Sequence, residues 1–444
     1  MSFSARQRAL VASASPEGIA AGARRVGTRS GGATWLAKGN RYRADAIGSL
    51  NADDLAGNIN DVDLAEYIAA SAPLHCSDGW AYLGRAISCH LHGDADTARH
   101  LAYYAELRAA MGLLASQGIA IFNQRHFVVD KAGTSARLYN DVGTHAATWQ
   151  VLEEWAGLDV ASRLLGSILH PNDVPMSEWI AAIPGGAAWQ PIATDWLLTM
   201  GLDLKYLRAD RAARNEASYR PTQLNSPKSM VARRAASVAH DMWRALEPTS
   251  SSAFGELDQH LLRSSLETAF HAVTGRTPSK KPKAFAQMIS SVVREVDPTA
   301  GRARWEHFLT REAEPGDSTV ISLARQRLVV SVPDHHASVM ARALLLLRVA
   351  SGACRQMLAD ADIKFDGLAF WWGGYGMTRG LWNAPPDSSG LTDTWADIEP
   401  ALQDVSEWIA GDSPDSYREL FSRVPHALTE LTSLEMVGLW SLAS

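Results

Sequence analysis

Polar side chains that could bind a phosphate and a nucleotide base follow one another near residue 100. His100, Tyr104 and Arg108 are spaced four residues apart, so on a helix they line one face. Arginine offers a planar pair of N–H donors to a phosphate, and tyrosine or histidine can stack on a base or hydrogen-bond with it. Taken alone, this stripe is also compatible with an ordinary solvated helix face.

Two later segments carry side chains of the same chemical kind. Thr144 and His145 begin a further expected helix, in which Thr144 could cap the N-terminus and His145 would lie at the positive end. We expect Tyr104, His145 and Arg211 to be the catalytic residues if the chain is an enzyme. The residues expected to hold the phosphate or ribose of a nucleic acid are Arg208, Arg211, Arg214, Asn215 and Tyr219.

The reaction that suits these residue types is the cleavage of RNA by its own 2′-hydroxyl group. A histidine would take the proton from the 2′-hydroxyl, and an arginine would stabilise the negative charge of the phosphorane. The sequence therefore predicts a ribonuclease if the chain has an activity at all.

Other common chemistries lack their signatures. The sequence contains no GxxxxGK[ST], no HExxH, no GxSxG and no GxGxxG after an expected strand. Cys76 and Cys89, with histidines beside them, suggest zinc ligands, but twelve residues separate them and no C-x-x-C is present. A buried free cysteine is the simpler interpretation. We expect no metal and no cofactor, and we rank a metal enzyme last.

Helices must position most of these side chains. Apolar residues recurring with the helical period predict helices over Asp53–Ala70, Trp80–His92 and Ala98–Ser116. The third should bury Tyr103, Leu107, Met111 and Leu114. Ile119–Phe122 and Phe127–Val129 flank a polar turn and predict a β-hairpin. The expected fold is mainly α, with two helical domains and a small β-hairpin.

The length of the chain favours two domains. Its 444 residues exceed the usual size of a single hydrophobic core, and Pro221–Ser229 is the best linker candidate. We divide the chain into an N-terminal arm (residues 1–45), a helical domain (46–225) and a C-terminal helical domain (226–444). The arm is expected to be loosely structured because glycine and serine are concentrated near residue 30.

Composition indicates a globular protein of the cytoplasm. Hydrophobic residues make up 46% of the chain and charged residues 20%, which excludes a disordered chain. We find no run of about 18 apolar residues for a membrane span and no continuous apolar region for a signal peptide. The three cysteines form no framework of pairs, and a reducing cytoplasm suits them.

Charge is distributed unevenly along the chain. Its net charge of -6 argues against a general nucleic-acid coat. Between Lys205 and Arg244, however, nine lysines and arginines against three acidic residues give a balance of +6. From Asp387 to the end, eleven acidic residues against two arginines give -9. These segments are either two solvated faces, or a basic surface for phosphate and an acidic region that contacts a partner or the basic half.

The order of the three polar segments resembles that of the HEPN superfamily, including its abortive-infection and nucleotidyltransferase-partner branches. Tyr103–Leu114, followed by Gly118, is similar to the family's "YYA…AA..LL…G" helix. Thr144-His145 looks like the start of its "TH" helix, and Arg211–Tyr219 looks like its closing "R…ADY" helix. The resemblance covers about a third of the chain, from Trp80 to Pro221.

This resemblance implies a helical bundle that dimerises and, where active, cuts RNA through an arginine followed by a histidine after four to six residues. Several pairs meet or approach this spacing. Arg163 and His170 lie inside the resembling stretch, and Arg234–His240 and Arg302–His307 lie beyond it, but in each of them an apolar residue replaces the polar one that usually follows the arginine. Two further pairs depart in position or spacing. Arg85 and His90 meet the spacing but precede the tyrosine helix, whereas Arg137 and His145 are well placed but have seven residues between them. The expected function is a HEPN-like component of a bacterial phage-defence or stress-response system that binds RNA and, if the chain is an enzyme, cuts it. The alternative is a non-catalytic scaffold for protein partners in a multi-subunit defence complex.

Overall fold

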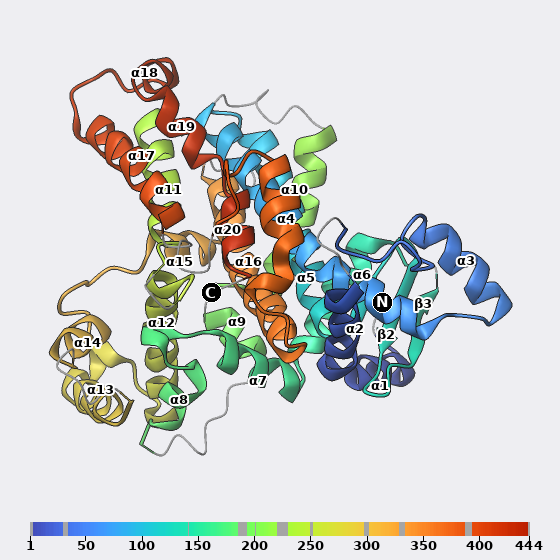
Figure 1. The fold of residues 1–444 in the computed structure, drawn as a ribbon. Coiled ribbons are helices and arrows are strands. Elements are labelled where there is room, and N and C mark those ends of the chain that lie inside the picture. Colours follow the sequence, from blue (N-terminus) through green and yellow to red (C-terminus); the bar gives the residue numbers. More distant parts are fainter. Residues whose placement is uncertain are drawn as a thin grey trace.

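The computed structural model describes residues 3–29, 34–140, 142–184, 193–199, 201–219, 230–248, 252–296, 302–327, 334–386 and 393–442 (Figure 1). As predicted, the fold is mainly helical, with a small antiparallel sheet. The N-terminal half contains α1 (Ala5–Ser13), α2 (Pro16–Arg29), α3 (Ala46–Ala56), α4 (Asp61–Leu91), α5 (Ala95–Ser116), β1 (Ile119–Ile121), β2 (Arg125–Val129), β3 (Ser135–Asn140), α6 (Thr144–Ala156), α7 (Asp159–Ile168), α8 (Met176–Ala181), α9 (Ala193–Thr199) and α10 (Leu204–Tyr219). The C-terminal half contains α11 (Ala232–Arg244), α12 (Gly255–Thr274), α13 (Pro282–Val296), α14 (Arg302–Leu309), α15 (Thr319–Ala324), α16 (His335–Asp360), α17 (Asp393–Ala410), α18 (Tyr417–Arg423), α19 (Pro425–Leu431) and α20 (Glu435–Trp440).

Three long helices form the centre of the protein. α5 lies between α4 and α16 and packs against both, and α10 packs along another side of α5 (Figure 1). α16 is buried on all sides from its first residue, His335, to Cys354. Because a helix that is apolar all round must be covered all round, α16 is the core helix on which the others assemble.

The local sequence of α5 explains its position and its ends. Asp94 caps its N-terminus by accepting a hydrogen bond from the backbone N–H of Thr97. Gly118 follows its C-terminus with a φ of +85°, a conformation that favours glycine. The predicted buried face is confirmed, because Tyr103, Leu107 and Leu114 are at most 4% exposed.

The helix predicted over Asp53–Ala70 is wrong in its boundaries. The segment is divided between α3, which ends at Ala56, and α4, which begins at Asp61. Gly57, with a φ of +67°, stops α3, and the side chain of Asn60 caps α4. α4 then continues through the predicted Trp80–His92 helix, so it also carries the residues that precede α5.

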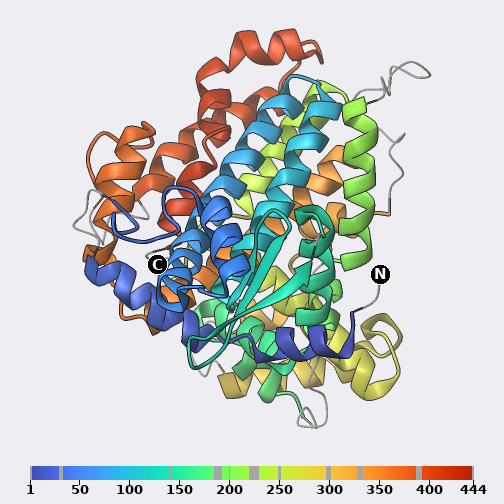
Figure 2. The ribbon, with the colours of Figure 1, turned by 90° about the vertical axis from the view of Figure 1, so that its right-hand side faces the viewer.

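The predicted hairpin is part of a three-stranded antiparallel sheet in the order β1-β2-β3. Ile119 pairs with Val128, which confirms the pairing of the two predicted segments. Figure 2 shows the sheet facing the viewer, with α10 (light green) to its right. β3 ends at Asn140 and α6 begins at Thr144, so the sheet lies close to the start of the helix that carries His145.

Residues 3–29 are more ordered than a loose arm. They form α1 and α2, and α2 buries Ile19, Ala23 and Val26 while packing against α4. The predicted linker Pro221–Ser229 lies outside the described residues, and the domain division stays a prediction. Residues on both sides of the linker nevertheless share one core, because α16 packs against α4 and α5.

Within the described residues, one helix has the length and composition of a membrane span. It is α16, and the whole of its most apolar window is buried inside the protein. Burial of this kind is typical of a core helix, because neighbouring helices cover the surface that lipid would contact.

Replacing Leu107 with aspartate should destabilise the protein by several kcal/mol, on the order of 3 or more, because it places an unpaired charge in a buried face. Leu107 is 4% exposed on α5. Chemical denaturation measures the change. The matched control is Leu55→Asp on α3, where the side chain is 86% exposed and the same substitution should have little effect. Equal stability of the two variants would contradict this assignment of the buried face.

Candidate functional site

A pocket of about 510 Å³ opens where α4, α5, α6 and α10 meet. Tyr104, His145 and Arg211, the three predicted catalytic residues, all line it. They are 41 and 66 residues apart in sequence, so the fold brings them together. The remaining lining residues are Tyr82, Leu107, Arg108, Met111, Asn123, Gly143, Thr144 and Ala146.

The N-terminus of α6 forms one wall of this pocket. Gly143 precedes the helix and has no side chain to cap it, so the predicted capping role of Thr144 is wrong. The Thr144 hydroxyl instead donates to the backbone carbonyl of Phe122 at 3.4 Å. The first N–H groups of a helix have no intrahelical acceptor and carry the positive end of its dipole. This wall can therefore bind an anion.

Two arginines of α10 add positive charge beside this wall. Arg211 and Arg214 are half-buried, and among the described residues no carboxylate forms an ion pair with either. Arg214 lies over the rings of Tyr103 and Tyr104, at 5.3 and 5.6 Å from their centroids. Its Nε has no hydrogen-bond partner in the described part of the chain. Half-buried arginines without acidic partners are a cost to folding that an anionic ligand would offset.

His145 faces this positive charge. Its ring stacks against that of Tyr103 and meets Tyr104 edge-on. Its Nδ1 lies 2.9 Å from the Tyr103 hydroxyl. Burial lowers the pKa of His145, and the charges of Arg214 and Arg211 lower it further. His145 is therefore neutral at pH 7.

The opposite wall carries a third arginine. Arg108 on α5 donates to Nδ1 of His75 at 2.9 Å and lies 3.6 Å from Asp78. Burial and the charge of Arg108 lower the pKa of His75 to about 3. This arginine is partly neutralised, in contrast to Arg211 and Arg214.

Two aromatic and polar lining residues were not predicted from the sequence. The ring of Tyr82 on α4 stacks on that of Tyr104 at 5.5 Å between centroids, and Asn123 lies in the turn between β1 and β2. No local pattern marks either residue. The helical period of α4 indicates which face is apolar, but not which polar residue of a neighbouring helix it meets.

The other predicted nucleic-acid residues lie outside the pocket. Arg208 forms an exposed ion pair with Glu153 of α6. Asn215 is exposed, and Tyr219 is 80% exposed at the end of α10. His100 hydrogen-bonds with the hydroxyl of Ser218 at 2.7 Å. The predicted stripe therefore continues along α10 as a surface beyond the pocket.

The basic segment between Lys205 and Arg244 does not form one surface. On α11, Arg233 donates to backbone carbonyls of Trp408 and Ile409, and Arg244 pairs with Glu399 of α17 at 3.0 Å. Backbone carbonyl and carboxylate groups of the C-terminal region thus bind these two arginines of α11. Of the predicted basic region, α10 alone presents unpaired arginines within the described residues.

A buried ionic network lies behind the pocket wall. Arg342 of α16 binds Asp210 of α10 through two hydrogen bonds of 2.7 and 2.8 Å. Glu106 of α5 lies 3.7 Å from the same guanidinium group and is 0% exposed. Neither carboxyl oxygen of Glu106 has a hydrogen-bond partner in the described part of the chain. Burial raises the pKa of Glu106 well above its usual value, and the carboxylate of Asp210 raises it further.

Replacing Glu106 with glutamine should remove a loss of stability at high pH. The folded state holds the Glu106 proton more tightly than the unfolded state, in which the pKa of Glu106 is 4.5. The contribution of Glu106 to the free energy of unfolding is therefore fully present below pH 4.5. It is lost as the pH rises towards the pKa of Glu106 in the folded state, by up to about 1.4 kcal/mol per pH unit. Glutamine resembles the neutral carboxyl group and does not titrate.

Urea denaturation at a series of pH values, with Glu153→Gln on the exposed surface as the control, measures this effect. The Glu106→Gln variant should equal the wild type near pH 4.5 and exceed it at neutral pH. A variant with the pH dependence of the wild type would show that Glu106 does not carry this proton.

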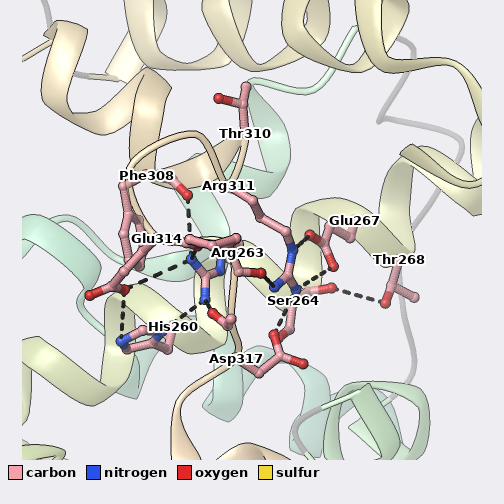
Figure 3. Close-up of polar contacts among 12 residues, drawn as sticks. His260, Arg263, Ser264, Glu267, Thr268, Phe308, Thr310, Arg311, Glu314 and Asp317 are labelled. Atoms are coloured by element: carbon pink, nitrogen blue, oxygen red, sulfur yellow. Dashed lines mark hydrogen bonds and ion pairs between the residues drawn. The ribbon is translucent and has the colours of Figure 1, made fainter. Parts of the chain in front are cut away.

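A second polar cluster illustrates arginines that have acidic partners. Figure 3 shows Arg263 of α12 and Arg311, after α14, held by carboxylate and carbonyl oxygens. Arg263 donates to the backbone carbonyl of Glu314 at 2.8 Å, and Arg311 binds Glu267 and Asp317. Both guanidinium groups lie beside carboxylates, although Nε of Arg263 has no hydrogen-bond partner among the described residues. The cluster therefore links α12 to the loop after α14.

The pairs Arg85–His90 and Arg137–His145, which the family motif suggests, do not form a site. Arg85 is 3.8 Å from Glu435, whereas His90 is buried and hydrogen-bonds with His336. Arg137 binds Asp54 of α3, and no contact between Arg137 and His145 is present among the described residues. The arginines that accompany His145 come from α10 instead.

The cysteines do not gather around a metal position. Cys76 and Cys354 are buried with their sulfur atoms 3.4 Å apart, and Cys89 is half-buried elsewhere on α4. Within the described ranges, no group of three or more histidine, cysteine or acidic side chains is arranged to hold a metal ion.

Comparisons with known proteins give no relative: no protein-family model, no curated protein and no solved structure matches the chain. The resemblance to the HEPN superfamily therefore rests on the motifs of α5, α6 and α10 alone.

Proposed function

We propose that the chain is a HEPN-like component of a bacterial phage-defence or stress-response system, and that it binds single-stranded RNA at the pocket between α5, α6 and α10. The observation that carries this proposal is the pair of half-buried arginines, Arg211 and Arg214, without acidic partners beside a helix N-terminus. Elsewhere in the described chain, buried arginines such as Arg342 and Arg348 have carboxylate partners.

The ligand chemistry follows from the donors. Arg211 supplies a planar fork for two phosphate oxygens, and the first N–H groups of α6 supply further donors. His145 is neutral but keeps one ring N–H. Together these groups suit a phosphate diester, which carries a single negative charge and several acceptor oxygens.

The aromatic side chains favour RNA over a free anion. Tyr104 and Tyr82 line the same pocket as Arg211, and unstacked bases bind to aromatic rings in single-stranded RNA. A volume of about 510 Å³ exceeds what a phosphate alone would fill. Asn123 adds an amide that can donate to a base and accept from it.

Cleavage is the reaction that this pocket would perform on RNA. Attack of a 2′-hydroxyl oxygen on the adjacent phosphorus breaks the bond to the 5′-oxygen. It leaves a 2′,3′-cyclic phosphate and a 5′-hydroxyl end, with the 2′-hydroxyl proton passing to solvent water and the 5′-oxygen taking a proton from water. Arg211 would stabilise the charge that develops on the phosphorane, and His145 would lie beside the reacting phosphate. The resemblance implies a homodimer for this activity.

Binding of a single-stranded RNA oligonucleotide, followed by fluorescence anisotropy at increasing salt, tests the proposal. We expect binding at about 50 mM salt that weakens steeply as salt rises, because each neutralised phosphate releases a counterion. An absence of binding at that salt concentration would remove the nucleic-acid function. The alternative, a scaffold that binds protein partners of a multi-subunit complex, would then take its place.

A further inference from the structure

Two buried aromatic side chains hold His145 through a chain of hydrogen bonds. The indole Nε1 of Trp149 donates to the hydroxyl oxygen of Tyr103 at 3.3 Å. The same hydroxyl group lies 2.9 Å from Nδ1 of His145. Tyr103 is 0% exposed and Trp149 is 3% exposed, so water does not compete for these bonds.

The direction of the first bond is fixed by chemistry. An indole N–H can only donate, so the Tyr103 oxygen is the acceptor. Tyr103 keeps its own proton, because burial raises the pKa of its hydroxyl to about 12. Within the described residues, Nδ1 of His145 is the only acceptor that hydrogen-bonds with this hydroxyl.

The opposite arrangement leaves a buried proton without an acceptor. If Nδ1 of His145 carried the proton, the Tyr103 oxygen would accept from both the imidazole and the indole. The hydroxyl proton of Tyr103 would then have no partner in a buried site. The loss of this hydrogen bond favours the tautomer with the proton on Nε2 over the one with the proton on Nδ1 by about tenfold or more.

We propose that Trp149 and Tyr103 hold neutral His145 in the tautomer with its proton on Nε2, and thereby make His145 a fixed hydrogen-bond donor to a phosphate oxygen of bound RNA. Trp149 and Tyr103 are positioning residues, because they act through His145. The tautomer stands on the geometry alone, whereas the phosphate contact rests on the proposed function.

The tautomer changes the role that the sequence suggests for His145. A base must offer a lone pair to the proton that it takes, and in this tautomer Nε2 has none to offer. His145 therefore binds and polarises the phosphate. To take the 2′-hydroxyl proton, His145 would first have to pass its Nε2 proton to another group. The other route is to reverse the direction of its hydrogen bond with Tyr103, which would place the proton on Nδ1.

Long-range proton–nitrogen NMR correlations of the imidazole rings test the tautomer directly. The full-length protein is labelled with nitrogen-15 and measured at about pH 8, where a neutral histidine shows one protonated and one bare nitrogen. The His145 signal is identified by its loss in His145→Gln. We expect Nε2 to carry the proton. A proton on Nδ1 in the wild type would overturn the inference while leaving RNA binding unaffected.

Two variants test whether the hydrogen bonds through Trp149 and Tyr103 cause the tautomer preference of His145. Tyr103→Phe removes the hydroxyl, and Trp149→Phe keeps an aromatic ring but removes the N–H donor. Tyr103→Phe should reduce the preference to a mixture of tautomers. Trp149→Phe leaves the hydroxyl free to turn away from His145, so it should weaken the preference by less, and it keeps the inference testable if the first variant fails to fold. The signals of His100, which bonds with Ser218 instead, should not change. A preference that persists in both variants would overturn the role of Tyr103 and Trp149.

Addition of a single-stranded oligouridylate to the labelled protein separates the two parts of the inference. We expect the Nε2–H signal of His145 to shift as it donates to a phosphate oxygen, and the shift to saturate with RNA binding. RNA binding without this shift would overturn the donor role of His145 but not the proposed function. A failure of RNA to bind at all, with the Nε2 tautomer intact, would overturn the proposed function and the phosphate contact.

Discussion

Replacing Arg211 with alanine should weaken the binding of single-stranded RNA by about ten- to a hundredfold, because a charge-assisted hydrogen bond contributes about 1.5–3 kcal/mol. The slope of the logarithm of affinity against the logarithm of salt should become shallower by about 0.7 to 1 for the lost phosphate contact. Fluorescence anisotropy across a salt series measures both. Arg214→Ala should weaken binding as well, with an added effect on the packing of Tyr103 and Tyr104.

Arg208 offers a matched control for this prediction. It lies one helical turn before Arg211 on α10 and carries the same charge, but it is exposed and pairs with Glu153. Arg208→Ala should therefore have a much smaller effect on affinity. Equal losses in the two variants would show that RNA responds to the net charge of α10 and not to the pocket.

Replacing Arg342 with methionine should destabilise the fold by about 3–5 kcal/mol, because it leaves a buried carboxylate without its partner. Arg342 and Asp210 are each 2% exposed, and they join α16 to α10 directly beside Arg211. Denaturation in urea measures the loss. Arg208→Met, which breaks an ion pair on the surface, should cost less than about 1 kcal/mol.

The double variant Arg342→Met, Asp210→Leu distinguishes an ion pair from simple packing. Because removal of both charges leaves no buried carboxylate at that position, it should recover much of the stability lost in Arg342→Met. A double variant that is as unstable as the single one would mean that the guanidinium group contributes packing alone.

Local sequence determines the elements of the site but not their neighbours. The apolar period and Asp94 mark α5, and Gly143-Thr144 marks the start of α6, so both could be predicted. Thr144 was expected to cap α6, but Gly143 occupies the capping position, and the Thr144 hydroxyl donates to the backbone carbonyl of Phe122, which directly follows β1. Such a contact depends on how the sheet is placed, which no local pattern encodes.

Contacts between segments far apart in the chain could not be predicted from the sequence for the same reason. Asp210 and Arg342 are 132 residues apart, so the sequence does not show that Asp210 is occupied by Arg342 and is not a partner for Arg211. Arg233 and Arg244 looked equally suited to phosphate in the sequence. Their carbonyl and carboxylate partners on α17 and beyond became apparent only in the fold.

The position of RNA on the protein tests the central claim most directly. Crosslinking of thiouridine-substituted RNA by near-ultraviolet light, followed by mass spectrometry of the peptides, locates the bound bases. We predict crosslinks on the α4 and α5 peptides that contain Tyr82 and Tyr104, and their loss in Arg211→Ala. The most basic exposed segment away from the pocket contains Lys280, Lys281 and Lys283. Crosslinks confined to that segment, and unchanged in Arg211→Ala, would contradict an RNA site in the pocket.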